Sequence, residues 1–322
     1  MTTEPRPDLD HANPPGSIVV GVDGSADAAR AVTWAAQEAS LEHRPLVLLH
    51  ALDTTWQAVD VWRTNSLADT FETRHLTQLA ARATVDAAAQ GVRLTYPDLE
   101  VIASVVDLDP RQALIAASRT AHLLLVGSRG RGPVRGLLLG SVSVATAQLA
   151  TCPVVVCRHR RGQLATHGII VGTDGSPASA PVLDFAFRQA SLHLAPLTVM
   201  HCYWDAVGAG ALRRPDASTS AEETQRRLAE AVAGYAETYP DVELRVELAT
   251  GLVDQVLAGT APESDLLVVG RHHRSARGRV VHGSMAATVV QHAAGTVAVV
   301  PEAEWPTDAQ VRHGAVAVPY GA

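Results

Sequence analysis

Short, continuously apolar runs alternate along the chain with longer stretches whose apolar residues recur at helical spacing. Runs that are apolar at every position are typical of strands buried on both faces of a parallel sheet. Strands that alternate with helices predict right-handed βαβ units and an α/β fold with a doubly wound parallel sheet. In the first half we expect strands at 18–22, 46–49, 99–106, 123–126 and 154–157, and helices that include 67–90 and 110–119.

The same pattern occurs twice. The sequence IVVGVDGS at 18–25 returns as IIVGTDGS at 169–176, and LLLVGSRG at 123–130 returns as LLVVGRHH at 266–273. A duplication of this length predicts two tandem domains, each with a five-stranded sheet, rather than a solenoid. We expect a tail at 1–17, domains at 18–160 and 161–302, and a second tail at 303–322. In the second copy the expected strands include 169–173, 197–200, 242–249 and 297–300, and the expected helices include 221–239 and 252–259.

Each opening motif ends in a turn that leads into a helix. Ser25 and Ser176 are expected to cap these helices, and Pro177 is of the type favoured at a first helical position. Asp23 lies in the first turn, where a carboxylate can accept backbone N–H groups or bind the hydroxyl groups of a ligand. The two roles can coexist.

Composition narrows the class of protein. A length of 322 residues fits two domains, and 47% hydrophobic with 18% charged residues is typical of a globular chain. The net charge of −7 gives no electrostatic reason to expect nucleic acid as a partner. No apolar run approaches the roughly 18 residues of a membrane span. Because the first residues lack an apolar signal region, and Cys152, Cys157 and Cys202 follow no disulfide or metal pattern, we expect a cytoplasmic protein with buried thiols.

A glycine-rich stretch follows the fourth expected strand. Its spacing is Gly127-x2-Gly130-x9-Gly140-Ser141, and a helix is expected to follow. Glycines let backbone N–H groups approach a ligand, and a helix N-terminus adds unpaired donors and a partial positive charge. The stretch therefore predicts a phosphate cradle, and the alternative is a flexible surface loop. The side chains that would complete the cradle are Arg129, Arg131, Arg135, Ser141 and Ser143.

Other well-known site motifs do not fit the sequence. The dinucleotide fingerprint follows a first strand, whereas this loop follows the fourth, and a P-loop requires a lysine that is absent. Neither a Gly-x-Ser-x-Gly elbow nor an HExxH motif occurs. His50 and His201 end their strands and are expected to be structural. A solvated loop rather than a metal site is expected for His272, His273, His282 and His292.

The loop spacing, the opening IVVGVDGS and the closing PVVV at 153–156 together resemble the universal stress protein family in its tandem-domain, actinobacterial form. The resemblance runs from about residue 18 to residue 300, and the loop matches the family signature G-x2-G-x9-G-[ST] in full. It implies a Rossmann-like sheet with strand order 3-2-1-4-5 in each domain. It also implies ATP, alone or with Mg²⁺, held between the first-strand turn and the glycine loop.

The resemblance assigns positions in this chain to parts of ATP. Gly21 and Asp23 would lie by the adenosine, and the backbone at Ala51 would face adenine. The segment 127–130 would wrap the ribose and phosphates, and the segment 141–143 would bind phosphate oxygens. The cofactor-binding residues expected in the first domain are Gly21, Asp23, Ala51, Gly127, Ser128, Arg129, Gly130, Gly140, Ser141, Val142 and Ser143.

The second copy departs from this pattern. His273 stands where the first copy has Gly130, and Ala286 stands in place of Ser143. A side chain at 273 opposes close approach of the backbone, and Ala286 removes a hydroxyl donor. Weaker or absent ATP binding is therefore expected in the second domain. Its corresponding residues are Gly172, Asp174, Gly270, Gly283 and Ser284.

These features favour an ATP-binding stress-response regulator that acts through nucleotide-dependent conformation or through an unknown protein partner. Fast catalysis is not expected, because no general base or metal-binding carboxylate pair accompanies the loop, although trace ATPase activity stays open. One alternative is an adenine-nucleotide α-hydrolase-like enzyme, a slow ATPase or an adenylating enzyme, but the S-G-G-x-D-S motif of its ligase members is absent. Another is a nucleotide-free interaction protein with a vestigial site.

The last strand of each copy raises the question of assembly. An unpaired apolar edge strand is a liability, so the strands at 154–157 and 297–300 are expected to pair. Pairing within one chain or between two chains would satisfy this requirement. The family resemblance favours a homodimer through these edges.

Overall fold

The computed structural model describes residues 13–53, 67–130, 139–159, 168–203, 221–271 and 285–303. Its first half contains the expected alternation of strands and helices. These are β1 (Ile18–Gly21), α2 (Ala26–Leu41), β2 (Leu46–Ala51), α4 (Leu67–Thr95), β3 (Val101–Val106), α5 (Pro110–Ala117), β4 (Leu123–Gly127), α6 (Ser141–Leu149) and β5 (Val154–Cys157).

The second half repeats this order. It contains β6 (Ile169–Gly172), η1 (Pro177–Ser179), α7 (Ala180–Leu192), β7 (Leu197–Tyr203), α8 (Ala221–Thr238), β8 (Leu244–Thr250), α9 (Val253–Thr260), η2 (Ala261–Glu263), β9 (Leu266–Arg271), α10 (Met285–His292) and β10 (Val297–Pro301).

The two helix starts differ from each other. The Ser25 hydroxyl accepts a hydrogen bond from the Ala28 N–H, so it caps α2 as predicted. Ser176 takes the N-cap position and Pro177 the first helical position, as predicted, but the helix that they begin is a 3₁₀ turn and the Ser176 side chain makes no capping bond. The Ser176 carbonyl instead accepts from both the N–H and the hydroxyl of Ser179, which tightens this turn before α7 begins.

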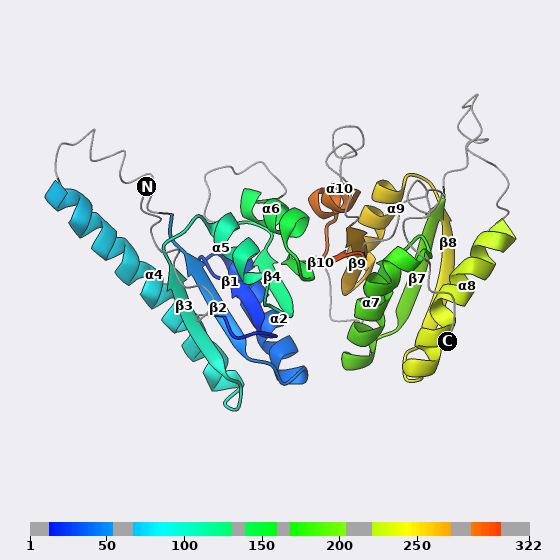
Figure 1. The fold of residues 1–322 in the computed structure, drawn as a ribbon, viewed down its shortest axis with the longest axis horizontal. Helices are drawn as coiled ribbons and strands as arrows, with labels where there is room; N and C mark the ends of the chain where they lie inside the picture. The colour runs from blue at the N-terminus through cyan, green and yellow to red at the C-terminus, as the bar shows by residue number, and fades with distance from the viewer. Residues whose placement is uncertain are drawn as a thin grey trace, which may run out of the picture.

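All ten strands form one sheet, in the order β3-β2-β1-β4-β5-β10-β9-β6-β7-β8 (Figure 1). The strands of each half are parallel to one another, and each half has the predicted order 3-2-1-4-5. The halves meet where β5 and β10 pair antiparallel, with Val156 opposite Val297 and Val154 opposite Val299. The doubly wound α/β fold is thus confirmed, and the two sheets are continuous.

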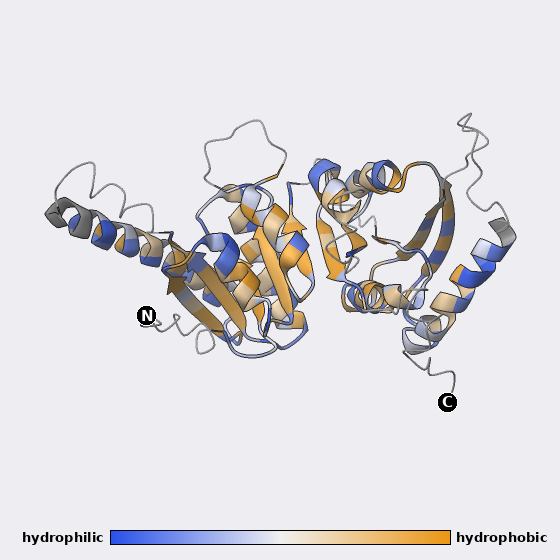
Figure 2. Ribbon diagram, turned by 45° about the horizontal axis from the view of Figure 1, so that its top comes forward, coloured by the Kyte–Doolittle hydropathy of each residue, from blue (hydrophilic) through white to orange (hydrophobic). Residues whose placement is uncertain are grey.

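Helices cover both faces of this sheet. One apolar core lies between the sheet and α2, α4, α7 and α8, and the other lies under α5, α6, α9 and α10 (Figure 1). In Figure 2 the strands are predominantly hydrophobic, whereas α4 and α8 carry hydrophilic residues along their outer sides. Each core draws side chains from both halves, so the halves are packed together as well as hydrogen-bonded.

A buried polar contact joins the halves beside the central strands. Glu38 of α2 is fully buried, and its carboxylate accepts hydrogen bonds from the Gln189 amide and pairs with Nε2 of His193 at 2.9 Å. The ring of His193 lies 6.1 Å from that of Trp34, measured between centroids. Because β5 and β10 already pair within the chain, the edges that favoured a homodimer are occupied, and that reason for dimer formation is removed.

Candidate functional site

The glycine loop and the first-strand turn meet at one edge of the sheet. Strands β1 and β4 are adjacent and parallel, so the segments that follow Gly21 and Gly127 emerge side by side. The Ser25 hydroxyl donates to the carbonyl of Arg129 across this gap, with an oxygen–oxygen distance of 3.1 Å. In a doubly wound sheet this edge, at a reversal of strand order, is where ligands bind.

Asp23 faces the loop while it also stabilises its own turn. Its Oδ1 accepts the N–H of Ser25 at 2.9 Å, which forms an Asx turn, and Gly24 has a φ of 76°. Its Oδ2 would lie 2.6 Å from a Cβ atom placed on Gly130. The two roles considered for Asp23 are therefore compatible. The missing side chain at 130 leaves room for the carboxylate beside the loop.

Gly127 is a glycine for a different reason. A Cβ atom on it would come within 2.6 Å of the carbonyl carbon of Asp27 and 2.7 Å of the Ala28 nitrogen. These are backbone atoms of the first turn of α2, so a side chain could not be accommodated by rotation of a neighbouring group. The close approach packs the start of α2 directly against the end of β4.

Two buried hydroxyls hold the two ends of the loop. Ser128 donates to Oδ2 of Asp27 at 2.6 Å, and Asp27 also pairs with Arg30. Ser143 donates to the carbonyl of Gly127 at 2.7 Å. Both serines are less than 5% exposed. The sequence placed these residues at the nucleotide, whereas the structure gives their hydroxyls a role in fixing the loop.

The N-terminus of α6 faces the same edge. Gly140 occupies the N-cap position with φ −75° and ψ 150°, and its own N–H donates to the Ser128 carbonyl at 2.8 Å. Because glycine has no side chain, it cannot satisfy the N–H groups of the first helical turn. Ser141 is exposed and Val142 is half-buried at this turn. These donors and the helix dipole form an anion-binding arrangement.

Positive charge lies beside this arrangement. Arg129 is exposed on the loop, and Arg158 follows β5 at the same edge of the sheet. Burial lowers the pKa of Arg158, and the charge of Arg129 lowers it further. The predicted contributors Arg131 and Arg135 lie outside the described residues. Ala51 is half-buried at the end of β2.

The described residues do not offer a metal centre. Across the described ranges no group of three His, Cys, Asp or Glu side chains is placed to hold a metal ion. His201 is structural as predicted, because its Nδ1 lies 2.9 Å from the Thr173 carbonyl oxygen. His292 makes the same kind of contact with Thr288. His272, His273 and His282 lie outside the described residues, and His50 is half-buried at the end of β2.

The cysteines are consistent with inert thiols. Burial raises the pKa of Cys152 and that of Cys157 to about 12, so both thiols are protonated at neutral pH. Burial also raises the pKa of Cys202, which is only half-buried. The prediction of buried thiols is confirmed for the first two.

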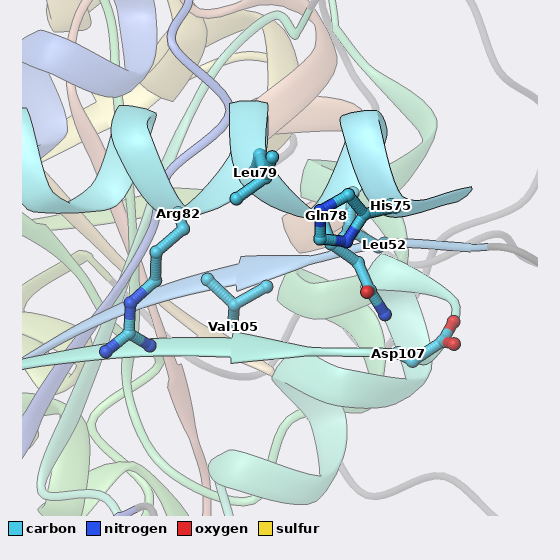
Figure 3. A pocket seen from close by; sticks show the side chains of 7 residues that line it. All are labelled: Leu52, His75, Gln78, Leu79, Arg82, Val105 and Asp107. Atoms are coloured by element: carbon cyan, nitrogen blue, oxygen red, sulfur yellow. The ribbon is translucent and has the colours of Figure 1, made fainter. Parts of the chain in front are cut away.

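A cavity that the sequence did not indicate lies near the ends of β2 and β3 (Figure 3). Its volume is about 370 Å³. Leu79 and Arg82 from α4 face Leu52 and Val105, and Asp107 at one end of the cavity forms an ion pair with Arg74. The cavity begins one residue beyond Ala51, the position expected to face adenine. Sequence spacing could not reveal it, because it depends on how α4 lies over the sheet.

The second half has the same turn but a different loop environment. Oδ1 of Asp174 accepts the N–H of Ser176 at 2.9 Å, as in the first turn. Gly172 packs against Leu257, as Gly21 packs against Leu114. A Cβ atom on Gly270, however, would collide with the carboxylate of Glu302. The neighbour of this glycine is therefore an acidic side chain rather than the backbone of the following helix.

The segment that carries Glu302 lies across the start of the second loop. The Glu302 N–H donates to the Arg271 carbonyl at 3.1 Å, and the Ala303 N–H donates to the Ala178 carbonyl at 3.0 Å. Glu302 is only 8% exposed. Sequence reasoning missed it, and its only signal was a charged residue directly after the last strand. Gly283 and Ser284 lie outside the described residues, and Ala286 is buried in the first turn of α10.

Comparisons with known proteins agree on one family. The profile of the universal stress protein family matches residues 16–158 and again residues 166–301. A universal stress protein of Mycolicibacterium smegmatis is 33% identical over 289 residues, which cover 88% of this chain and 96% of that protein. A universal stress protein of Mycobacterium tuberculosis H37Rv is 32% identical over 298 residues, covering 88% and 96%.

Solved structures share the fold. A universal stress protein from Archaeoglobus fulgidus superposes with a TM-score of 0.64 at 17% identity, covering 88% of this chain and 98% of that one. A putative universal stress protein from Pseudomonas aeruginosa gives a TM-score of 0.57 at 17% identity, covering 93% and 96%. In the part of this chain that the structure describes, no helix is long and apolar enough to cross a membrane.

Proposed function

The chain belongs to the universal stress protein family, and from this premise we propose that its first domain binds ATP between the Asp23 turn and the glycine loop. The observation that carries the proposal is the glycine-capped N-terminus of α6, which faces the same sheet edge as the carboxylate of Asp23. Unpaired N–H groups at a helix start suit phosphate, and a carboxylate suits ribose hydroxyls.

The parts of the ligand have plausible places along this edge. The phosphates would lie at Ser141 and Val142, within reach of the Arg129 side chain. The ribose would lie beside the Asp23 carboxylate, which itself lies against Gly130 because that residue has no Cβ. Adenine would face the backbone at Ala51, with the cavity beside Leu52 next to it. The other residues expected in this site would support the loop rather than bind the ligand. They are Gly21, Gly127, Ser128, Gly140 and Ser143.

Binding without fast hydrolysis fits the chemistry of this edge. The carboxylate of Asp27 lies at the start of the loop, but Ser128 and Arg30 already occupy its oxygens. A magnesium ion carried by the nucleotide would therefore be held mainly by the phosphates and water. In this reading the protein is a cytoplasmic regulator whose nucleotide occupancy changes its conformation or its affinity for a protein partner.

The second domain would bind ATP weakly or not at all. The carboxylate of Glu302 lies against Gly270 at the start of the second loop, so a phosphate brought to that edge would approach a buried negative charge. This argument adds to the replacement of Gly130 by His273 and of Ser143 by Ala286. The expected stoichiometry is about one ATP per chain.

Two measurements test the proposal. Mass spectrometry of nucleotide released from the purified, denatured protein identifies the ligand and its stoichiometry. Equilibrium titration then compares Asp23→Ala with its matched counterpart Asp174→Ala. We expect Asp23→Ala to remove most ATP binding and Asp174→Ala to change it little.

Equal losses from both variants would contradict the asymmetry between the two domains. Absence of bound or titratable nucleotide would favour the nucleotide-free interaction protein. Release of AMP and pyrophosphate would favour the enzyme alternative.

A further inference from the structure

Helices α6 and α10 each extend from one nucleotide loop toward the other. Because β5 and β10 are antiparallel, the edge where the strands of one half end is the edge where those of the other half begin. Helix α6 starts at Ser141 beside the first loop and ends at Leu149, on the side where β9 ends. Helix α10 runs the opposite way, and the two helices lie side by side over the centre of the sheet (Figure 1).

Arg271 connects the second loop to the end of α6. It directly follows Gly270, and its Nη1 and Nη2 donate to the carbonyls of Gln148 and Ala150 at 2.8 and 2.5 Å. These carbonyls have no further turn of helix to bind them, and a cation at a helix C-terminus is also favoured by the helix dipole. Burial lowers the pKa of Arg271 from its usual value, so the guanidinium is held in a partly desolvated position.

Arg158 makes the reciprocal connection. It follows β5 beside the first loop and donates through its two terminal nitrogens to the carbonyls of Val290 and Ala293, at the end of α10. Ala150 and Ala293 are equivalent in the two copies. The two arginines are not equivalent. When the strands of the two copies are matched, Arg271 corresponds to Ser128 of the first copy, and Arg158 corresponds to Pro301 of the second. The same clamp on the C-terminal end of a helix is therefore built twice from different sequence positions.

The start of the second loop is also tied to the segment that covers it. The carbonyl of Arg271 accepts the N–H of Glu302, and Ala303 is bonded in turn to Ala178 at the start of the second domain's helices. A displacement of Arg271 would therefore be passed to Glu302 and Ala303. The resulting chain of contacts runs from the N-terminus of α6 through Arg271 to the cover of the second loop.

We propose that Arg271 is a positioning residue for the first nucleotide site, and that α6 couples occupancy of that site to the covering segment of the second. This inference rests on the proposed function, since it assigns a regulation to the same site. A phosphate drawn to the first turn of α6 acts on a rigid rod about 13 Å long, and the far end of that rod is held by Arg271. Without the guanidinium fork, α6 is less firmly held against the sheet.

Hydrogen exchange of the wild-type protein tests the coupling without any substitution. ATP should change exchange of the Glu302 and Ala303 amides, which lie in the second domain, and the change should vanish in Asp23→Ala at the same ATP concentration. If ATP binds but these amides exchange unchanged, the coupling is wrong. A change that persists in Asp23→Ala would also overturn it, because ATP would then act on the second domain directly. Failure of ATP to bind at all would instead refute the proposed function.

A pair of arginine substitutions tests the positioning role. Arg271→Ala should weaken ATP binding by about threefold to tenfold and abolish the exchange response at Glu302 and Ala303. The matched control is Arg93→Ala, which also removes a bond to a backbone carbonyl, that of Val101 at 2.7 Å, but lies on α4 away from both loops. The control should bind ATP normally. Unchanged affinity and response in Arg271→Ala, with thermal melting showing a folded protein, would contradict the proposal.

Discussion

At the residue scale, the glycines of the first loop have different structural roles, although the sequence motif does not distinguish them. Gly127 makes room for the backbone of α2, whereas Gly130 makes room for one carboxylate, that of Asp23. The first is a requirement of packing and the second a requirement of the site. The two should therefore respond differently to an added methyl group.

Gly130→Ala should separate binding from folding. Its Cβ would lie 2.6 Å from Oδ2 of Asp23, so the carboxylate must move, and we expect ATP affinity to fall about tenfold or more while the melting temperature changes little. The matched control is Gly91→Ala on α4, whose added Cβ meets nothing within 4 Å. Isothermal titration and thermal melting of the two variants provide the check. Normal ATP affinity in Gly130→Ala would show that Asp23 is not a ligand.

The acid sensitivity of folding can also be assigned to a residue. Burial opposes ionisation of Glu42, but its hydrogen bonds to His122 and Arg44 and the charges of His122 and Arg188 outweigh this and lower its pKa from 4.5 to about 2. A lowered carboxyl pKa stabilises the fold above the unfolded value, and this contribution disappears as pH falls from about 4.5 to 2. The contribution is about 3 kcal/mol at most. Urea unfolding at pH 5 and pH 2.5 should show a smaller pH effect in Glu42→Gln than in the wild type, and an equal effect would contradict the assignment.

At the element scale, the inner strands were predictable because they are buried on both faces and therefore apolar at nearly every position. The expected strand bounds match the structure to within two residues, except that β7 continues three residues beyond its expected end, to Tyr203. Helix α4 was less predictable, since Gly91 follows residue 90 and glycine commonly ends a helix. The helix continues to Thr95 because Val92 packs into the core and holds the next turn in place. Local propensity was thus overridden by packing that no local pattern shows.

The candidate site, like the secondary structure, was predictable only in part. The meeting of the Asp23 turn with the glycine loop followed from strand order alone. Strand order did not predict the buried hydrogen bonds of Ser128 and Ser143. It also did not predict the position of Glu302 or the contacts of Arg271. Each depends on how a helix or the other half of the chain lies against the loop. Sequence spacing therefore indicated which segments meet at the candidate site, but it did not distinguish residues that face this edge from residues that hold the loop in place.

At the scale of the whole molecule, buried polar groups join the two halves in addition to the pairing of β5 with β10. Glu38→Ala should destabilise the protein by about 3 kcal/mol, since it leaves Gln189 and His193 without their shared acceptor. The exposed Glu237 of α8 offers a control, and Glu237→Ala should stay within about 0.5 kcal/mol of the wild type. Equilibrium urea unfolding measures both. A similar small effect in both variants would show that the junction depends on the sheet alone.

The pairing of β5 with β10 also has a consequence for the newly made chain. The strand at Val154–Cys157 is finished 140 residues before its partner begins at Val297 (297 − 157 = 140). At usual rates of translation this interval lasts on the order of ten seconds. Throughout it, a folded first half displays an apolar edge to the cytosol and to neighbouring ribosomes on the same message. A chaperone that binds the exposed edge of β5 is thus most needed after the first half has folded and before the second half has emerged from the ribosome.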